Sequence, residues 1–539
     1  MVFTKRSAEL LACCIGWICF GICCYHFFQL SSVIFNVSTP FDTDEADHAN
    51  AALELMMAIR SGSFASIFEA IHRQSFYPPL HSFIVAPFYL FLSPSLASSR
   101  LPSLVLLIGS IFCFYIILKR TNICDRRHFL FASLCSLCFF VESPILAENS
   151  VLCMLELPGV FIVCMMLAVA AYHTWWQTAG LILLSFALML TKYSFAAMVI
   201  PAIFCWLLIE TLHTRGTAQA IKRTLLAGLC FTILMIGWLG FARFDSVIKF
   251  FTSHPSYAPL TSWENLSFDL LGWIQYYHAH KIVGLFSAAL ILLSCLIQQK
   301  TPLLRLAQYI AINSFIVLLC SSTNEIRHFI VAFPPLILLT LYPLIHRSAT
   351  TTAHTILRLL LVAALCFGSF MQLYTYRKGL IVGLEGKPEL GMLQETLMRT
   401  IDPSKPTLVI GANDQLSIES LRWHAAVAAH IPYTHVVFTS FPYREDKILT
   451  QQTRSRNVDM WLADGVVAKS FPQIIREGHF QQLVILRKIG SSDPLISSIL
   501  QSNAESQLKR KKFGGRELIV ADQAALDTLA ASAAQLAPE

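Results

Sequence analysis

Long apolar segments recur along most of this chain, and short clusters of basic residues separate them. Of the 539 residues, 55% are hydrophobic and only 14% are charged, and the mean hydropathy is +0.59. A soluble globular protein cannot bury so much apolar surface, whereas a helix of about 20 apolar residues crosses a bilayer. The pattern therefore predicts an α-helical polytopic membrane protein.

The positive charge follows the same pattern. The formal net charge is +7, and the lysines and arginines of the first 376 residues lie mainly in short loops between apolar segments. Cytoplasmic loops of membrane proteins carry an excess of such residues. We therefore interpret the charge as a topology signal and expect no nucleic-acid partner.

The basic clusters predict how the chain lies in the membrane. Residues 5–6 place the N-terminus in the cytoplasm, so the first apolar segment carries the chain outward. The next basic cluster, 119–127, is then cytoplasmic, and two apolar segments, 79–93 and 101–118, compete for the crossing back. The first is short and contains Pro87, so we expect an interfacial or re-entrant helix there.

With the second segment as the crossing, every later basic loop falls on the cytoplasmic side, and the count is about eleven transmembrane helices. The predicted spans are 10–33, 101–118, 128–142, 156–172, 178–191, 194–212, 224–242, 282–298, 306–322, 329–345 and 357–373. We expect a multi-pass protein of the bacterial inner (plasma) membrane, with its active site on the periplasmic, extracytoplasmic side.

The composition changes after Tyr376. Strand-like runs alternate there with helical patterns such as 416–428, and this alternation predicts a soluble α/β domain. The strand-like runs are 407–410, 435–439, 466–468, 483–486 and 518–520. We therefore expect a membrane domain over 1–376, with a long outer first loop (33–100) that carries interfacial helices, and a C-terminal soluble α/β domain over 377–539 on the outer face.

A cluster of acidic residues follows the first apolar segment. Four carboxylates and one histidine stand within seven positions: Asp42, Asp44, Glu45, Asp47 and His48. A purely structural interpretation is that Thr43 or Asp44 caps a helix and the other acids favour its positive N-terminal end. A cap needs only one or two of them, so we favour a role in acid–base chemistry. We expect His48 to be solvated rather than to bind a metal.

Several short motifs follow one another in a characteristic order. They are the Asp44-Glu45 pair, Tyr77-Pro78-Pro79-Leu80, Ser99-Arg100-Leu101-Pro102-Ser103, Glu156-Leu157-Pro158, Leu190-Thr191-Lys192-Tyr193, and Glu325-Ile326-Arg327-His328 with Pro334. Together they resemble the glycosyltransferase C (GT-C) superfamily, in particular the branch of protein O-mannosyltransferases and lipid A aminoarabinose transferases. The resemblance covers residues 1–345, and the tail has no equally clear match.

The resemblance implies a reaction. Members of this superfamily move a sugar from a polyprenyl-phosphate donor to an acceptor on the outer face of the membrane. The leaving phosphate is a stable anion, so one base and a few cations suffice, and direct displacement inverts the anomeric carbon. The resemblance leaves the acceptor open between lipid, glycan and protein, and we favour a lipid or an envelope glycan. No cofactor is certain, because some branches use a divalent cation and others do not.

The resemblance also implies roles for individual residues. Asp44 matches the catalytic aspartate and Glu45 its acidic neighbour, while Glu156 stands where relatives carry a second acidic residue. The structural alternative for Glu156 is a carboxylate that stabilises a helix N-terminus, and Glu148 competes for its role.

Lys192 and Arg327 are the expected ligands of the donor phosphate, with His328 beside them. Snorkelling to the membrane surface would explain one such cation, but two on the outer face favour a functional role. The remaining candidates near the site are Asp42, Asp47, Glu148, Tyr77 and Tyr193.

Three other functions stay open at this point. A protein O-mannosyltransferase-like enzyme differs only in the acceptor. A lipid-linked sugar transporter or flippase would show related halves, which the sequence lacks. A non-enzymatic assembly factor that docks through the tail leaves the acidic first loop without a purpose.

Overall fold

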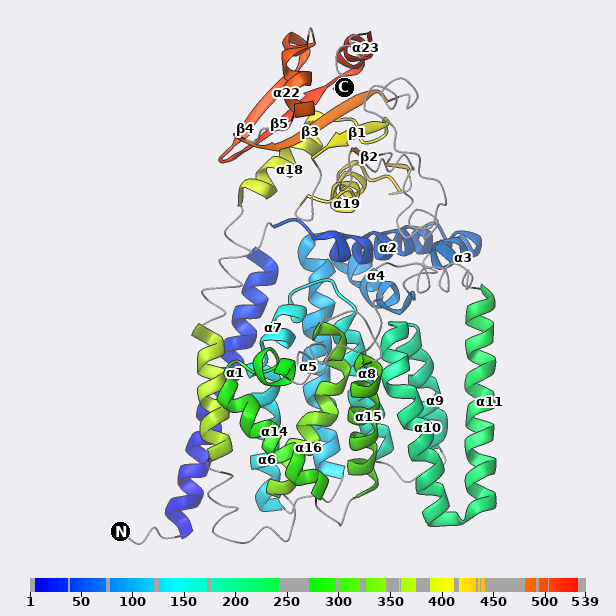
Figure 1. Ribbon diagram of the computed structural model, residues 1–539, viewed down its shortest axis with the longest axis vertical. Helices are drawn as coiled ribbons and strands as arrows, with labels where there is room; N and C mark the ends of the chain where they lie inside the picture. Colours follow the sequence, from blue (N-terminus) through cyan, green and yellow to red (C-terminus); the bar gives the residue numbers. More distant parts are fainter. Residues whose placement is uncertain are drawn as a thin grey trace. The chain divides into compact units, whose positions relative to one another are not determined.

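The computed structural model of the full chain (Figure 1) describes most of its residues. They are residues 5–36, 39–73, 78–120, 126–171, 176–241, 271–296, 301–319, 326–345, 358, 360–374, 388–411, 416–432, 435–436, 438–441, 480–490, 494–502 and 504–531.

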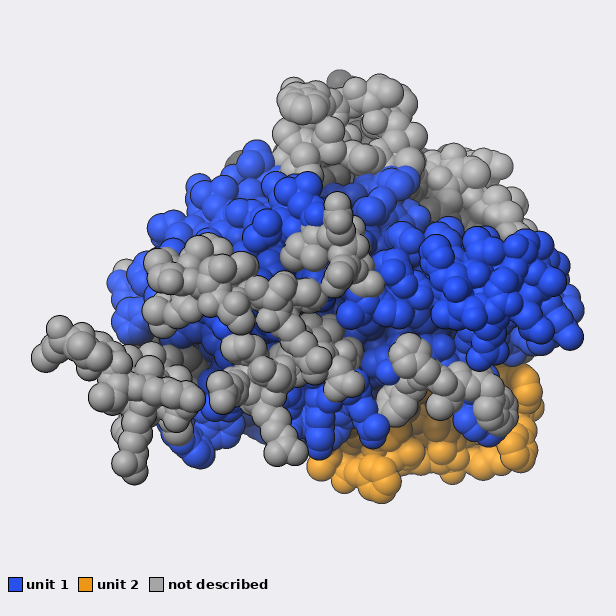
Figure 2. Space-filling view, turned by 90° about the horizontal axis from the view of Figure 1, so that it is seen from below, with its two compact units in different colours: residues 1–36, 100–241, 254–382 blue, residues 37–99, 242–253, 383–539 orange. Residues whose placement is uncertain are grey.

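The chain forms two compact units (Figure 2). The helical unit comprises residues 1–36, 100–241 and 254–382, and the sheet unit comprises 37–99, 242–253 and 383–539. The first loop and the C-terminal residues therefore belong to one unit. Its position on the outer face of the membrane stays a prediction.

In the helical unit a helix lies at each of the predicted spans. The helices are α1 (Lys5–Asn36), α5 (Leu96–Arg120), α6 (Arg126–Glu142), α7 (Pro144–Ser150), α8 (Glu156–Ala170), α9 (Trp176–Met189), α10 (Tyr193–Arg215), α11 (Thr217–Phe241), α14 (Lys281–Leu296), α15 (Pro302–Leu319), the 3-10 helix η1 (Ile326–Ala332), α16 (Phe333–Ile345) and a helix over Leu360–Tyr374.

Among the described residues, four helices are long and apolar enough to cross a membrane: Leu96–Arg120, Tyr193–Arg215, Thr217–Gly240 and Arg327–Ile345. A fifth span results if α6 and α7, which meet at a bend of 69°, are taken as one. The chain is thus a multi-pass membrane protein, and the full count of crossings stays a prediction.

Helix α10 is a centre of packing in the helical unit, where it contacts α9, α11 and α15 (Figure 1). Pro201 interrupts the hydrogen bonding of α10, because proline has no N–H to donate to Ala197 O one turn earlier. The side-chain amide of Asn313 on α15 donates to that carbonyl at 2.9 Å and to Met198 O at 2.6 Å. Helix α15 thus supplies the hydrogen bond that Ala197 O lacks within α10, and it fixes α10 in place.

The first loop of the sheet unit folds into three helices, α2 (Thr43–Arg60), α3 (Phe64–Arg73) and α4 (Leu80–Leu92), and α2 packs against both others. Helix α4 matches the segment expected to be interfacial or re-entrant. Its 13 residues are too few to span a bilayer.

The C-terminal part of the sheet unit forms a five-stranded sheet of order β2-β1-β3-β5-β4. The strands are β1 (Thr407–Ile410), β2 (Phe438–Phe441), β3 (Gln482–Lys488), β4 (Lys509–Phe513) and β5 (Arg516–Ala521). β1 pairs in parallel with β2 and β3, whereas β5 runs antiparallel to β3 and β4.

Helices cover both faces of this sheet (Figure 1). On one face α22 (Pro494–Gln501) and α23 (Gln523–Ala531) bury an apolar core that includes Leu408, Ile485 and Ile519. The other face carries α18 (Pro388–Thr400) and α19 (Ile418–Ala429). The predicted C-terminal α/β fold is therefore present, and the strand expected at 466–468 lies outside the described residues.

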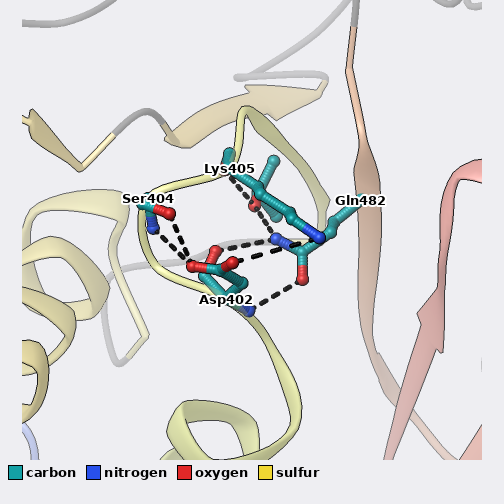
Figure 3. A network of polar contacts seen from close by, with 5 residues as sticks. Asp402, Ser404, Lys405 and Gln482 are labelled. Carbon is teal, nitrogen blue, oxygen red and sulfur yellow. Dashed lines mark hydrogen bonds and ion pairs between the residues drawn. The ribbon is translucent and has the colours of Figure 1, made fainter.

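The loop after α18 is tied to β3 through Gln482 (Figure 3). The Gln482 side chain accepts a hydrogen bond from Asp402 N at 2.9 Å and donates to Asp402 O at 2.8 Å. The hydroxyl and backbone N–H of Ser404 donate to the Asp402 carboxylate and hold the pKa of Asp402 below its ordinary value. This network aligns the start of β1 with β3.

Candidate functional site

The acidic cluster opens helix α2, and its cap is not the one predicted from sequence. Asp42 is the N-cap: its backbone is extended, and its carboxylate accepts a hydrogen bond from Glu45 N at 2.8 Å. The expectation that Thr43 or Asp44 caps the helix is wrong, because the helix already begins at Thr43, one residue earlier than a cap at Thr43 requires. Asp44 is therefore not the capping residue.

The other members of the cluster differ in burial. Asp44 and Asp47 are half-buried, whereas Glu45 is buried. His48 is also buried and lies against His81 of α4, with the ring centres 5.1 Å apart. The expectation that His48 is solvated is wrong, because α4 packs along the face of α2 that carries it.

The second predicted group lies in the helical unit, where α8 and α10 begin. Glu156 is the first residue of α8, only 1% exposed, and Lys192 directly precedes α10. Lys192 Nζ donates to Glu156 Oε1 at 3.3 Å, and its side chain is 18% exposed. Glu156 Oε2 is buried with no hydrogen-bond partner among the described residues. A buried carboxylate is thus compensated by one cation that still reaches the surface.

Gly159 permits this close approach of α8 and α10. A Cβ atom at Gly159 would lie 2.7 Å from Phe195 Cδ2 on α10 and 3.1 Å from Val331 Cγ1 on η1. The Phe195 ring in turn lies under Lys192, with 5.1 Å between Nζ and the ring centre. A single glycine one turn after Glu156 therefore lets three elements converge.

The 3-10 helix η1 brings the second predicted cation to the same region. It packs against α7, α8 and α10 and carries Arg327 and His328, both half-buried. Arg327 lies within electrostatic range of the exposed Glu148 on α7. Both Lys192 and Arg327 lie within electrostatic range of His328. Each predicted cation thus has one of the two competing carboxylates nearby.

Two further candidates have different outcomes. Tyr193 OH accepts a hydrogen bond from Trp238 Nε1 of α11 at 3.1 Å, which joins α10 to α11. Tyr77 lies outside the described residues.

Within the described part of the chain, no group of three or more His, Cys, Asp or Glu side chains is arranged to hold a metal ion. Neither predicted group therefore offers a full set of protein ligands there. The use of a divalent cation, which the resemblance leaves open, is still to be tested.

One buried polar pair could not be predicted from the sequence. Glu142 lies at the bend between α6 and α7, and its carboxylate contacts His278 Nδ1 and accepts a hydrogen bond from Ala279 N at 2.9 Å. Both side chains are fully buried. The partners are 136 positions apart, and no local pattern links them.

Comparisons with known proteins place this geometry in a known fold. No protein-family model matches the chain, and no curated protein sequence matches it. Solved structures do: ArnT from Cupriavidus metallidurans in the apo state superposes with a TM-score of 0.61 at 14% identity, over 93% of this chain and 98% of that one. This chain has the ArnT fold.

A second ArnT structure, bound to undecaprenyl phosphate, gives a TM-score of 0.58 at 12% identity and covers 96% of this chain and 98% of that one. The oligosaccharyltransferase of Archaeoglobus fulgidus gives 0.49 at 12% identity, over 86% of this chain and 67% of that one. The fold of this chain is thus the one that the resemblance implied.

Proposed function

We propose that this protein is a membrane glycosyltransferase that moves a sugar from a polyprenyl-phosphate donor to an acceptor. The observation that carries the proposal is the ArnT fold with two cations and two carboxylates gathered where α8, α10 and η1 meet. The ArnT structure with undecaprenyl phosphate supports a polyprenyl-phosphate donor.

In the proposed reaction the acceptor hydroxyl attacks the anomeric carbon of the sugar. The bond between that carbon and the phosphate oxygen breaks as the new glycosidic bond forms, and the anomeric configuration inverts. Asp44 takes the proton of the hydroxyl, and polyprenyl phosphate leaves as an anion. A positioned base of this kind contributes roughly 10²–10⁴ to the rate.

Lys192 and Arg327 are assigned to the phosphate. An ammonium group has three donors, and the contact to Glu156 uses one of them, so Lys192 can bind Glu156 and an anion together. A half-buried guanidinium adds a planar pair of donors suited to phosphate oxygens. Cations placed where charge develops on the leaving group lower the barrier.

The acceptor is assigned only by class. We favour a lipid or an envelope glycan over a protein, and the outer face of a bacterial inner membrane as the place of reaction. A transporter of lipid-linked sugars would use the same cations to bind its cargo without breaking a bond.

Purified protein in proteoliposomes with a radiolabelled polyprenyl-phosphate sugar tests the proposal. Envelope lipids, polysaccharides and exported proteins from a deletion strain serve as separate acceptor fractions. Label that moves to one fraction, and fails to move with Asp44→Asn, supports the transferase. Label that only crosses the bilayer would identify a transporter, and label that does neither would refute both.

A further inference from the structure

Helix α19 of the C-terminal α/β fold packs directly on α2, the helix whose first turn carries Asp44. Both helices belong to the sheet unit. At their contact Trp423 of α19 lies against Phe41, with the ring centres 4.9 Å apart and the planes at 79°. Both rings are buried, and an edge-to-face pair of this kind is worth more than its buried area alone.

The position of Phe41 in the chain makes this contact informative. Phe41 directly precedes Asp42, which caps α2, and Asp44 follows two residues later. The N-cap fixes where a helix begins and in which direction its first turn points. A ring that holds Phe41 therefore holds the start of the helix that presents Asp44.

A polar contact fixes α2 at a second point. The side-chain amide of Asn50 on α2 donates to Glu419 O on α19 at 3.0 Å, and Asn50 is completely buried. One contact lies just before α2, at Phe41, and the other lies within it, at Asn50. Together they limit both the rotation of α2 about its axis and its sliding along α19.

Trp423 also contacts α4, which packs against α2. The ring of Tyr89 on α4 lies 6.5 Å from that of Trp423, and Tyr89 OH shares a hydrogen bond with Ser99 Oγ at 2.6 Å. The indole thus lies against both Phe41, just before α2, and Tyr89 on α4.

Helix α19 is itself fixed to the sheet. The buried Arg422 donates to Phe438 O of β2 at 2.7 Å and pairs with Glu419 at 3.2 Å. Ser417 caps the helix through Ser420 N at 3.1 Å. Buried contacts therefore join β2 to Phe41 through the neighbouring residues Arg422 and Trp423.

We propose that Trp423 is a positioning residue: the C-terminal α/β fold holds the Asp44 carboxylate in place through the Trp423–Phe41 contact. The proposal rests on the proposed function of Asp44 as base. A base works only within hydrogen-bond reach of its proton, and a misplacement of about 1 Å can cost about 10²-fold in rate. In this proposal the C-terminal fold contributes to catalysis by positioning the base.

Three variants of the full chain test this in the transfer assay: Trp423→Ala, Trp423→Phe and Ile485→Ala. Trp423→Ala should lower kcat by at least about tenfold and leave the donor KM within about twofold, since only the base moves. Trp423→Phe keeps a ring against Phe41 and should recover most of kcat. Ile485, buried in the core on the opposite face of the sheet, is the matched control, whose loss should lower Tm without lowering kcat of the folded protein.

Equal loss of kcat in Trp423→Ala and Ile485→Ala, once corrected for the folded fraction, would overturn the proposal. So would a Trp423→Phe variant that folds normally but turns over no faster than Trp423→Ala. The double variant Phe41→Ala/Trp423→Ala should lose little more activity than Trp423→Ala alone, because both changes break one contact.

Amide hydrogen exchange separates failure of this proposal from failure of the proposed function. The first turns of α2 should exchange faster in Trp423→Ala but not in Ile485→Ala, whatever the reaction is. If they do, while Asp44→Asn keeps full activity, the base assignment fails and the coupling of α19 to α2 stands. Unchanged exchange in α2 would overturn the coupling itself.

Discussion

Asp44 and Glu156 each lie in the first turn of a helix, yet their surroundings differ. Asp44 is half-buried, and its helix is capped by Asp42. Glu156 is buried, its helix has no side-chain cap, and its carboxylate pairs with Lys192. Both carboxylates gain from the positive end of a helix.

The difference indicates different tasks. A general base must meet an acceptor hydroxyl, and Asp44 is only half-buried. A buried carboxylate at 3.3 Å from an ammonium group instead fixes where that cation lies. We therefore propose that Asp44 takes the proton and that Glu156 positions Lys192. The variants below test each of these two roles separately.

The largest effect is expected from Asp44→Asn. The change keeps the size of the side chain and leaves the Asp42 cap intact, so the free energy of unfolding should fall by less than about 1 kcal/mol. Turnover should fall by roughly 10²–10⁴, because proton acceptance is lost. Steady-state transfer and the melting temperature in detergent check the two numbers. Asp42→Asn, which preserves the cap, is the control, and normal turnover in Asp44→Asn would move the base to Glu45 or Glu156.

Next comes Arg327→Ala. A charge-assisted contact to phosphate is worth about 1.5–3 kcal/mol, so kcat/KM for the donor should fall by about 10- to 100-fold, with little change in Tm. Arg223→Ala is a matched control: this arginine of α11 bonds to Thr178 and Gln177, and its removal should lower Tm alone. If Arg327→Ala loses activity only as it loses stability, Arg327 is a snorkelling residue.

Lys192→Met should have a smaller and mixed effect. It removes a phosphate ligand and also leaves the buried Glu156 carboxylate without its cation, which costs about 1–3 kcal/mol of stability. The double variant Lys192→Met/Glu156→Gln also removes the negative charge of Glu156. It should regain stability, measured as Tm, but not donor use, measured as kcat/KM for the donor. Recovery of both together would show that the pair is purely structural.

The sequence predicts well those features that repeat or that stand next to one another. The spans follow from hydropathy, and helices lie at all of them because burial in a membrane requires apolar residues in continuous runs. Strand β1 was predicted at the residues it occupies, since a central strand is apolar on both faces. The motifs around Glu156 and Lys192 could be recognised because each is local.

Other features depend on what the fold brings together. Strand β4 was missed: Lys509–Phe513 reads as a charged run, because the strand lies at the edge of the sheet and exposes its first four side chains. The burial of His48 depends on α4, and the ring contact of Trp423 joins segments far apart in the chain. No local pattern carries such information.

Gly159 provides the smallest and most specific test of the comparison. In Gly159→Ala the new methyl group would meet the Phe195 ring at 2.7 Å, so α8 and α10 must separate slightly. Overpacking of this kind costs about 1–3 kcal/mol. Because the shift lengthens the contact between Glu156 and Lys192, kcat/KM for the donor should fall by about 2- to 5-fold, while the acid–base step at Asp44 is untouched.

Gly228→Ala on α11 is the control: its nearest neighbour would be 4.0 Å away, and alanine favours a helix by about 0.5–1 kcal/mol. The pair should therefore move Tm in opposite directions, and only Gly159→Ala should raise the donor KM. A Gly159→Ala variant that lowers kcat at saturating donor instead would mean that Glu156 and Lys192 take part in the chemical step, and the division of tasks between Asp44 and Glu156 would be wrong.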